Sequence, residues 1–238
     1  MGVLRRFGIS VLVAVVAGCG GGGDGADDDD GGPDAAPEVG VDAEPTVRPE
    51  PGPILGDFEL TYYWVTAEDE FKGAADTDIY DDACDVLATV PAAYADDLDL
   101  EGTGRLADGR VVNVSGACGC ARSPCYMEVD AEHPWGYGVQ DRALVPYRTF
   151  AVDPDVIPYG TPLYFAELDG EPMPGDAPWG DFIHDGCAVA GDTGGAIIGM
   201  HVDWFVALRD SYRLLDERLG LTEITVRAGG ERCVDWAD

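Results

Sequence analysis

Short segments in which hydrophobic and polar residues alternate recur along the chain from residue 60 onward. Alternation with a period of two, together with many β-branched and aromatic residues, is typical of strands. The segments that fit are 60–66, 110–115, 149–153, 162–168, 187–192 and 224–229. Because glycine and proline separate such short segments, the pattern predicts a mainly β fold of the barrel type.

A helical period occurs near the C-terminal end of the chain. Apolar side chains there are spaced by three and four residues, and Gly220 follows them as a C-terminal stop. The side chains in this stripe are Phe205, Leu208, Tyr212, Leu215 and Leu219. We therefore expect one short helix that packs its apolar stripe against the barrel wall.

Residues 1–19 have the pattern of a bacterial lipoprotein signal. Arg5 and Arg6 form a basic start, and the apolar stretch 7–17 is too short to span a bilayer. The sequence Val-Ala-Gly-Cys that follows resembles a lipobox, so Cys19 is the expected lipidation site. We expect an exported lipoprotein on the periplasmic face of the outer membrane or at the cell surface. An ordinary secretory signal is the alternative.

The next segment, residues 20–56, is rich in glycine, proline, alanine and acid and carries hardly any bulky side chains. Such a segment cannot bury enough apolar area to offset the entropy of ordering, so we expect a disordered acidic linker. Residues 57–238 are long enough for one domain with a sizeable core and short for two. We therefore expect a single domain after the linker.

The chain is strongly acidic, with a formal net charge of −32 at pH 7. This charge disfavours binding to nucleic acid or to an anionic lipid surface. It does not attract an anionic wall polymer either, so any glycan contact must come from local hydrogen bonds and aromatic stacking. We expect a monomer that binds no nucleic acid.

Six cysteines remain once the lipidation candidate is set aside. In an exported protein an even set predicts disulfides, although sequence alone does not choose the pairing. The candidates are Cys84, Cys118, Cys120, Cys125, Cys187 and Cys233. A zinc site in the cluster 118–125 with His133 is the alternative, but its spacing matches no standard zinc motif. We expect disulfides and no metal.

Two blocks of sequence place aspartates among apolar and turn residues, where a carboxylate is unfavourable to bury unless it is paired or used. They are residues 150–161, FAVDPDVIPYGT, and residues 192–205, DTGGAIIGMHVDWF. These blocks resemble the signatures of the 3D (three-aspartate) domain of MltA-type lytic transglycosylases and RlpA-like wall-remodelling proteins. The three family aspartates correspond here to Asp153, Asp192 and Asp203.

The resemblance implies a six-stranded double-psi β-barrel with loop insertions and a short C-terminal helix over residues 57–238. It is weak between residues 71 and 100, where an acidic loop is expected around Asp76, Asp78, Asp81 and Asp82. The insertion 169–185 is expected to be a surface loop. The large accessory domain of full MltA enzymes, which forms the other wall of the glycan groove, is expected to be absent.

The resemblance also implies an enzyme that cleaves the MurNAc-GlcNAc β-1,4 bond of peptidoglycan and forms 1,6-anhydromuramic acid. One carboxyl can serve as acid and then as base, so no cofactor is expected. Asp203 takes this role by resemblance, and its apolar neighbours and Asp192 are expected to raise its pKa. Asp192 and Asp153 are further catalytic candidates, with turn capping as the alternative and the favoured role for Asp153.

The expected substrate-binding residues surround these aspartates. They are Thr193, Gly194, Gly195, His201, Tyr63 and Trp135. Tyr63 should lie on the opposite strand face from Tyr62 and Trp64, so one face can pack and the other can meet sugar. The main alternative to an enzyme is a non-catalytic carbohydrate-binding or expansin-like wall-loosening module, because the segment His201-Val202-Asp203 resembles the His-Phe-Asp segment of expansin-like proteins. A third possibility is a surface scaffold that keeps only the fold.

Overall fold

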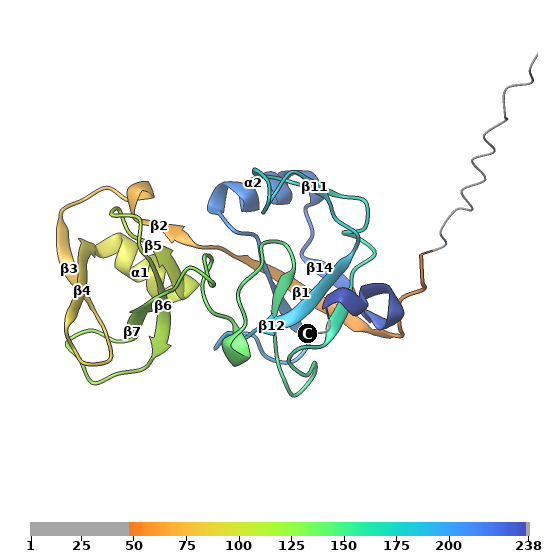
Figure 1. Ribbon diagram of the computed structural model, residues 1–238, viewed down its shortest axis with the longest axis horizontal. Helices are drawn as coiled ribbons and strands as arrows, with labels where there is room; N and C mark the ends of the chain where they lie inside the picture. The colour runs from red at the N-terminus through yellow and green to blue at the C-terminus, as the bar shows by residue number, and fades with distance from the viewer. Residues whose placement is uncertain (1–47, 237–238) are drawn as a thin grey trace, which may run out of the picture. The chain divides into compact units, whose positions relative to one another are not determined.

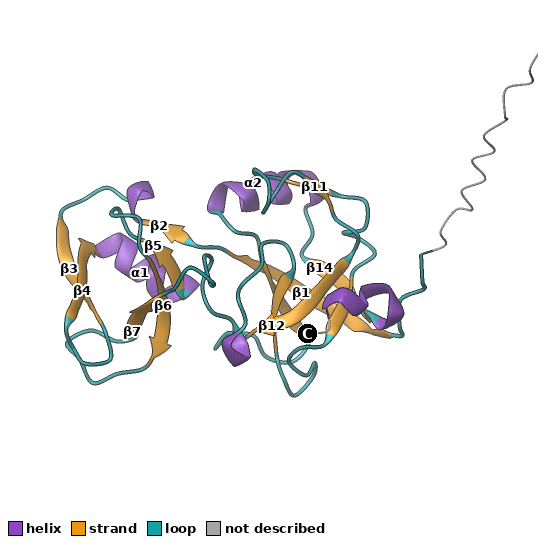
Figure 2. Ribbon diagram, in the orientation of Figure 1, coloured by secondary structure: helices purple, strands orange, loops and turns teal. Residues whose placement is uncertain are grey.

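The computed structural model describes residues 48–236, which form a β-barrel and a smaller lobe built on its own sheet (Figures 1 and 2). The predicted mainly β character is confirmed. The expected signal peptide with Cys19, and the part of the expected linker before residue 48, lie outside the described residues.

Six strands form a closed barrel in the spatial order β1-β13-β8-β12-β9-β14. The strands are β1 (Ile54–Tyr63), β8 (Thr149–Val152), β9 (Pro162–Tyr164), β12 (Cys187–Asp192), β13 (His201–Phe205) and β14 (Glu223–Ala228). The pairs β1/β13 and β8/β12 are parallel, whereas the other neighbours are antiparallel. Because β1 begins at Ile54, residues 54–56 belong to the barrel rather than to the expected linker.

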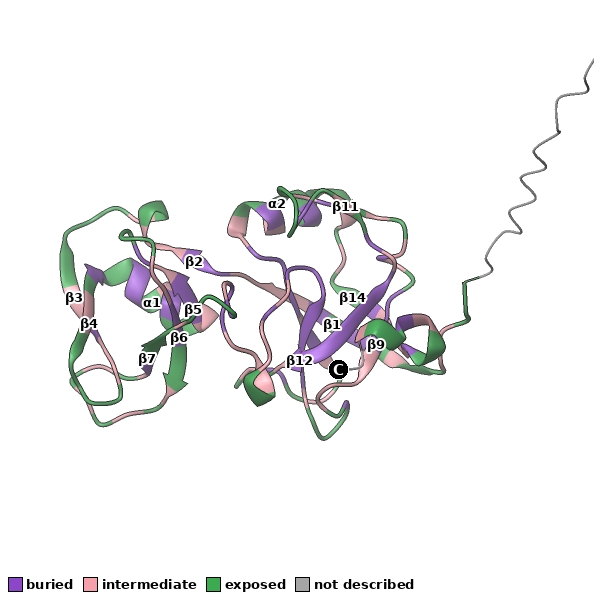
Figure 3. Ribbon diagram, in the orientation of Figure 1, coloured by how far each residue is buried: buried purple, intermediate pink, exposed green. Residues whose placement is uncertain are grey.

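On β13 buried residues alternate with partly accessible ones, whereas β12 is buried over most of its length (Figure 3). On β13, Val202 and Trp204 are fully buried, and Trp204 stacks on Phe150 of β8 with ring centroids 5.8 Å apart. His201 and Asp203, which alternate with these two residues, therefore point away from the core and remain partly accessible. The same alternation that buries the aromatic side chains places the predicted catalytic aspartate on the outer face.

The predicted helix is α2 (Arg209–Leu219), and it ends as expected at Gly220, which has a left-handed φ of 57°. It begins later than the apolar stripe suggested, because Phe205 is the last residue of β13. The helix packs on the barrel through Leu215 and through Tyr212, whose ring stacks on that of Trp64 at 5.1 Å.

Residues 66–128 form a smaller lobe, which corrects the expectation of an acidic loop around Asp76 and Asp82. Its strands β2 (Thr66–Ala67), β5 (Thr103–Arg105), β6 (Val111–Gly116) and β7 (Cys125–Glu128) form one sheet. The expected acidic loop is instead the hairpin of β3 (Ala75–Tyr80) and β4 (Val86–Pro91), after a 3-10 turn (Glu68–Glu70) and before helix α1 (Ala92–Glu101). The aspartates lie on accessible positions, while Ile79, Val90 and Leu98 build a separate core. The chain therefore contains, beside the barrel, a lobe with its own sheet and core that the sequence did not lead us to expect.

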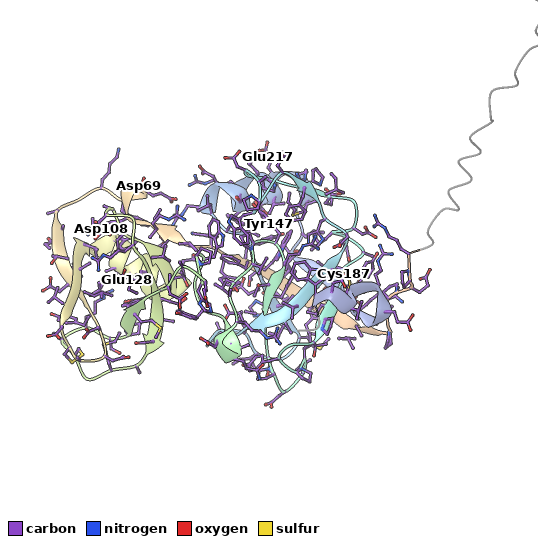
Figure 4. The ribbon with its side chains drawn as sticks, viewed as in Figure 1. Asp69, Asp108, Glu128, Tyr147, Cys187 and Glu217 are labelled. Carbon is purple, nitrogen blue, oxygen red and sulfur yellow. A yellow bond between two sulfur atoms is a disulfide. The ribbon has the colours of Figure 1, made fainter. Side chains whose placement is uncertain are left out.

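All six candidate cysteines form disulfides. Cys84–Cys120 and Cys118–Cys125 lie in the lobe, where they tie its loops together. Cys187–Cys233 connects β12 to the 3-10 segment Gly230–Trp236, and Cys187 is labelled on the barrel in Figure 4. The sulfur atoms that a zinc site at 118–125 would need are therefore engaged in covalent bonds.

The insertion 169–185 is more ordered than the expected surface loop. Strands β10 (Pro172–Met173) and β11 (Phe182–Ile183) pair within it. Met173 and His184 are buried, and the pKa of His184 falls to about 4 because burial disfavours its charged form. One further 3-10 turn spans Val139–Asp141. Among the described residues, no helix has the length and apolar character needed to cross a membrane.

Candidate active site

Strands β1 and β13 bring Asp203 together with Thr61, which pairs with it in the parallel register. The Thr61 hydroxyl donates a hydrogen bond of 2.8 Å to Asp203 Oδ1. His201 Nε2 lies 2.9 Å from the same hydroxyl oxygen. Since the hydroxyl has one proton, and that proton is given to Asp203, the histidine must donate to it. The three side chains thus form a short chain of hydrogen bonds that ends on Asp203.

Asp192 lies at the end of β12, where a bulge shifts the register between Ala190 and Asp192. Its two carboxylate oxygens have different donors. The Tyr63 hydroxyl donates to Oδ2 at 2.8 Å, and the backbone N–H of Thr193 donates to Oδ1 at 2.8 Å. Because both oxygens accept hydrogen bonds, this arrangement favours the ionised form of Asp192.

Asp192 and Asp203 line one pocket of about 120 Å³, whose other wall comes from the lobe. The lining residues from the lobe are Leu100, Glu101, Gly102, Thr103, Asn113 and Val114, and Tyr137 completes the wall. Asn113 holds this wall in place, since its Oδ1 accepts hydrogen bonds from the Thr103 hydroxyl at 2.7 Å and from the Tyr137 N–H at 3.0 Å.

Glu101 is a third carboxyl in the pocket. It is the last residue of α1, and Gly102 after it adopts the left-handed conformation that ends the helix. The backbone N–H of Trp64 donates to Glu101 Oε2 at 3.1 Å. The pocket therefore contains carboxyl groups from two barrel strands and from the lobe.

Burial dominates the electrostatics of these carboxyl groups. It raises the pKa of Asp203 to about 6, although the Thr61 hydrogen bond and His201 oppose the rise. Burial also raises the pKa of Asp192 to about 6, against its hydrogen bonds from Thr193 and Tyr63, and the charge of Asp203 adds a smaller upward effect. The pKa of Glu101 rises to about 8, mainly through burial. Near neutral pH the pocket can therefore hold both protonated and ionised carboxyl groups.

The structure brings some of the predicted binding residues to this pocket and leaves others outside. Thr193, Gly194 and Tyr63 line it, and His201 reaches Asp203 through Thr61. Gly195 is exposed and does not line it.

Trp135 does not line the pocket either, because its indole is buried. It packs edge-on against Phe205 and Trp179, and the guanidinium of Arg105 lies 5.7 Å from its ring centroid. The Trp135 ring therefore lies outside the pocket that holds Asp192 and Asp203, and it lines a separate pocket together with Trp179.

Asp153 lies outside the pocket, and both oxygens of its carboxylate accept backbone hydrogen bonds. Its Oδ2 accepts the N–H of Gly199 at 2.7 Å, and its Oδ1 accepts the N–H of Asp155 at 2.9 Å. These bonds hold the pKa of Asp153 below its usual value. The side chain thus fastens the segment between Asp192 and β13 to the end of β8, outside the pocket.

Sequence reasoning missed two residues of the site. Thr61 could have been found, because it lies two positions before Tyr63 and therefore on the same strand face. Glu101 carries no comparable signal, since its position depends on how the lobe folds.

Residues 148–223 match the family model of the 3D domain. The matched part of the chain contains all three signature aspartates. No curated protein matches the chain in sequence.

Among solved structures, the chain resembles MltA of Escherichia coli with bound chitohexaose, with a TM-score of 0.50 and 15% identity over 73% of this chain and 71% of that one. A membrane-bound lytic murein transglycosylase from Agrobacterium tumefaciens gives a TM-score of 0.44 and 13% identity over 73% and 72%. The lytic transglycosylase LtgG of Burkholderia pseudomallei gives a TM-score of 0.39 and 18% identity over 72% of this chain and 70% of that one. The match to the E. coli MltA structure shows that the chain shares the fold of MltA.

Proposed function

We propose that this protein is a lytic transglycosylase that cleaves the MurNAc-GlcNAc β-1,4 bond of peptidoglycan and leaves 1,6-anhydromuramic acid. The observation that carries the proposal is the environment of Asp203. This carboxyl is partly buried, has a raised pKa of about 6, and lines a pocket between two walls. The 3D domain match and the fold shared with an MltA that binds chitohexaose support the same conclusion.

Asp203 is suited to act first as an acid. Thr61 fixes its Oδ1, and no hydrogen-bond partner reaches Oδ2 from any residue between 48 and 236. The protonated Oδ2 gives its proton to the departing glycosidic oxygen as the bond to the muramic C1 breaks. The 6-hydroxyl of the same muramic residue attacks C1, and Asp203, now ionised, takes the proton that this hydroxyl loses. The enzyme returns to its starting protonation state.

Asp192 supplies negative charge beside the reacting carbon. Positive charge develops at C1 in the transition state of glycosidic cleavage. An ionised carboxylate in a poorly solvated pocket stabilises this charge, and the two hydrogen bonds to Asp192 favour its ionised form and orient it. Metal is not needed for any of these steps.

The wider assignments complete the proposal. We infer a double-psi arrangement of the barrel strands, which the two parallel pairs β1/β13 and β8/β12 support. We also propose that Cys19 carries a lipid, that the linker before the barrel gives it reach, and that the protein acts as a monomer on periplasmic glycan strands.

The test compares wild type with Asp203→Asn on purified peptidoglycan, with released muropeptides counted over time. We expect the variant to lose about 100-fold or more in rate, since its amide can neither donate an acid proton nor act as a base. Glycan binding without release of products by wild type would instead indicate a carbohydrate-binding module.

A further inference from the structure

A second cavity is lined by the turn that follows Tyr137. Its volume is about 520 Å³, and it is lined by Gln140, Arg142, Thr149, Val189, Gly191 and Trp236, among others. Gly191 directly precedes Asp192 on β12, so this cavity and the candidate active site meet at adjacent residues of one strand.

Arg142 distinguishes this cavity. The side chain is partly buried, and within residues 48–236 its guanidinium has no carboxylate, carbonyl or aromatic partner. Most other arginines of the described chain form ion pairs or hydrogen bonds, and Arg105 stacks on Trp135. In a chain with a net charge of −32, a cation left unpaired at a cavity is unusual. Five N–H donors in a planar fork suit a carboxylate.

The backbone that carries Arg142 is held firmly. The N–H of Gly138 donates to Arg142 O at 2.8 Å, and Tyr137 and Ala143 form a bridge across the same turn. His133 Nε2 lies 3.2 Å from Asp141 O and donates to it. Gln140 and Asp141 at the tip both have left-handed φ values, of 58° and 60°, which residues other than glycine adopt infrequently.

The turn is also fixed to the strand that carries Asp192. A Cβ at position 138 would collide with the carbonyl oxygen of Gly191, so glycine lets the two backbones touch. Tyr137 lines the candidate active site, and Arg142, on the same turn, lines the second cavity.

We propose that this cavity binds a carboxylate of the peptide branch of peptidoglycan, with Arg142 as its ligand. This inference rests on the proposed function. In such a substrate the peptide is attached to the muramic sugar whose C1 reacts, so it leaves the glycan close to Asp203. Asp235, at the exposed rim of the cavity, disfavours a purely anionic polymer and is compatible with a peptide that also carries amino groups.

The test measures kcat/KM on two substrates, glycan strands with their peptides and the same strands after an amidase has removed them. We expect wild type to prefer the peptide-bearing strands, and we expect Arg142→Ala to reduce this preference about tenfold. Arg142→Lys keeps the positive charge but not the planar fork of donors, so its preference for peptide-bearing strands should lie between those of wild type and Arg142→Ala. Arg213→Ala is the matched control, because Arg213 is an exposed arginine of α2 paired with Asp210.

A preference that is the same in Arg142→Ala as in wild type, with an unchanged circular dichroism spectrum, would overturn the peptide site. If wild type releases no product from either substrate, the proposed function fails, and the site is then tested by binding. The probe is the peptide acetyl-Ala-Glu-Ala, titrated into isotope-labelled protein. Shifts of the Gly191 amide that are lost in Arg142→Ala support the site, and their absence in wild type overturns it.

Discussion

The hydroxyl of Tyr63 donates a 2.8 Å hydrogen bond to Asp192 Oδ2 and so joins the first barrel strand to the end of β12. This bond lowers the pKa of Asp192, whereas burial raises it. The balance of the two effects decides whether Asp192 is ionised at the pH where Asp203 is protonated. Tyr63 is thus a positioning residue for the proposed electrostatic role of Asp192.

Replacement of Tyr63 by phenylalanine should raise the pKa of Asp192, because a hydrogen bond to the ionised form is lost. We expect kcat to fall about tenfold and the acidic limb of the pH profile to move to higher pH. Tyr62→Phe is the control, since Tyr62 lies on the opposite strand face and donates to Leu221 O. A profile of Tyr63→Phe that overlies that of wild type would remove Asp192 from the account.

The pH dependence of the wild-type rate should be a narrow bell centred near pH 6. Asp203 must be protonated to act as an acid, so the rate falls as pH rises through its pKa of about 6. Asp192 must be ionised, so the rate also falls as pH drops below its pKa of about 6. Thr61→Val should raise the pKa of Asp203 and move the alkaline limb upward, whereas Thr61→Ser should not. A rate that is constant between about pH 5 and 8 contradicts this assignment.

Glu101 should destabilise the folded protein at neutral pH. Its folded pKa of about 8 lies above its ordinary value of 4.5, so the folded state binds more protons and stability falls as pH rises between these values. Glu101→Gln removes the penalty and should stabilise the protein by about 1–2 kcal/mol near pH 7.5, with the gain vanishing near pH 4. Urea unfolding at both pH values measures this. If Glu101→Gln changed the free energy of unfolding equally at both pH values, Glu101 would titrate at its ordinary pKa.

Asp153→Ala should loosen the segment between Asp192 and β13 rather than stop the chemistry. Loss of the bonds to Gly199 and Asp155 should lower Tm and speed hydrogen exchange at the Gly199 amide. We expect a smaller loss of activity than in Asp203→Asn. Full loss of activity with unchanged exchange and Tm would instead make Asp153 part of the catalytic machinery.

Much of the barrel could be predicted because its signals are local. The alternation of Val202 and Trp204 with His201 and Asp203 fixes which side chains enter the core, and the position of Gly220 fixes where α2 ends. The signature aspartates stand out because carboxylates are rare beside buried aromatic residues.

The rest depends on contacts between distant segments. The hairpin β3/β4 has aspartates on its accessible face and was expected to be a loop, because its core contacts come from α1 and β7. The disulfide pairing, the position of Glu101 and the free guanidinium of Arg142 also follow only from the tertiary fold. The second wall of the pocket could not be read from the sequence for the same reason.

The most direct test of the central claim identifies the cleavage product of the purified protein acting on peptidoglycan in water enriched in heavy oxygen. If the muramic 6-hydroxyl attacks C1, the products end in 1,6-anhydromuramic acid and carry no heavy oxygen. Asp203→Asn should yield none of these products. Reducing ends labelled with heavy oxygen would show that water is the nucleophile, and this result would contradict the proposed intramolecular reaction at Asp203.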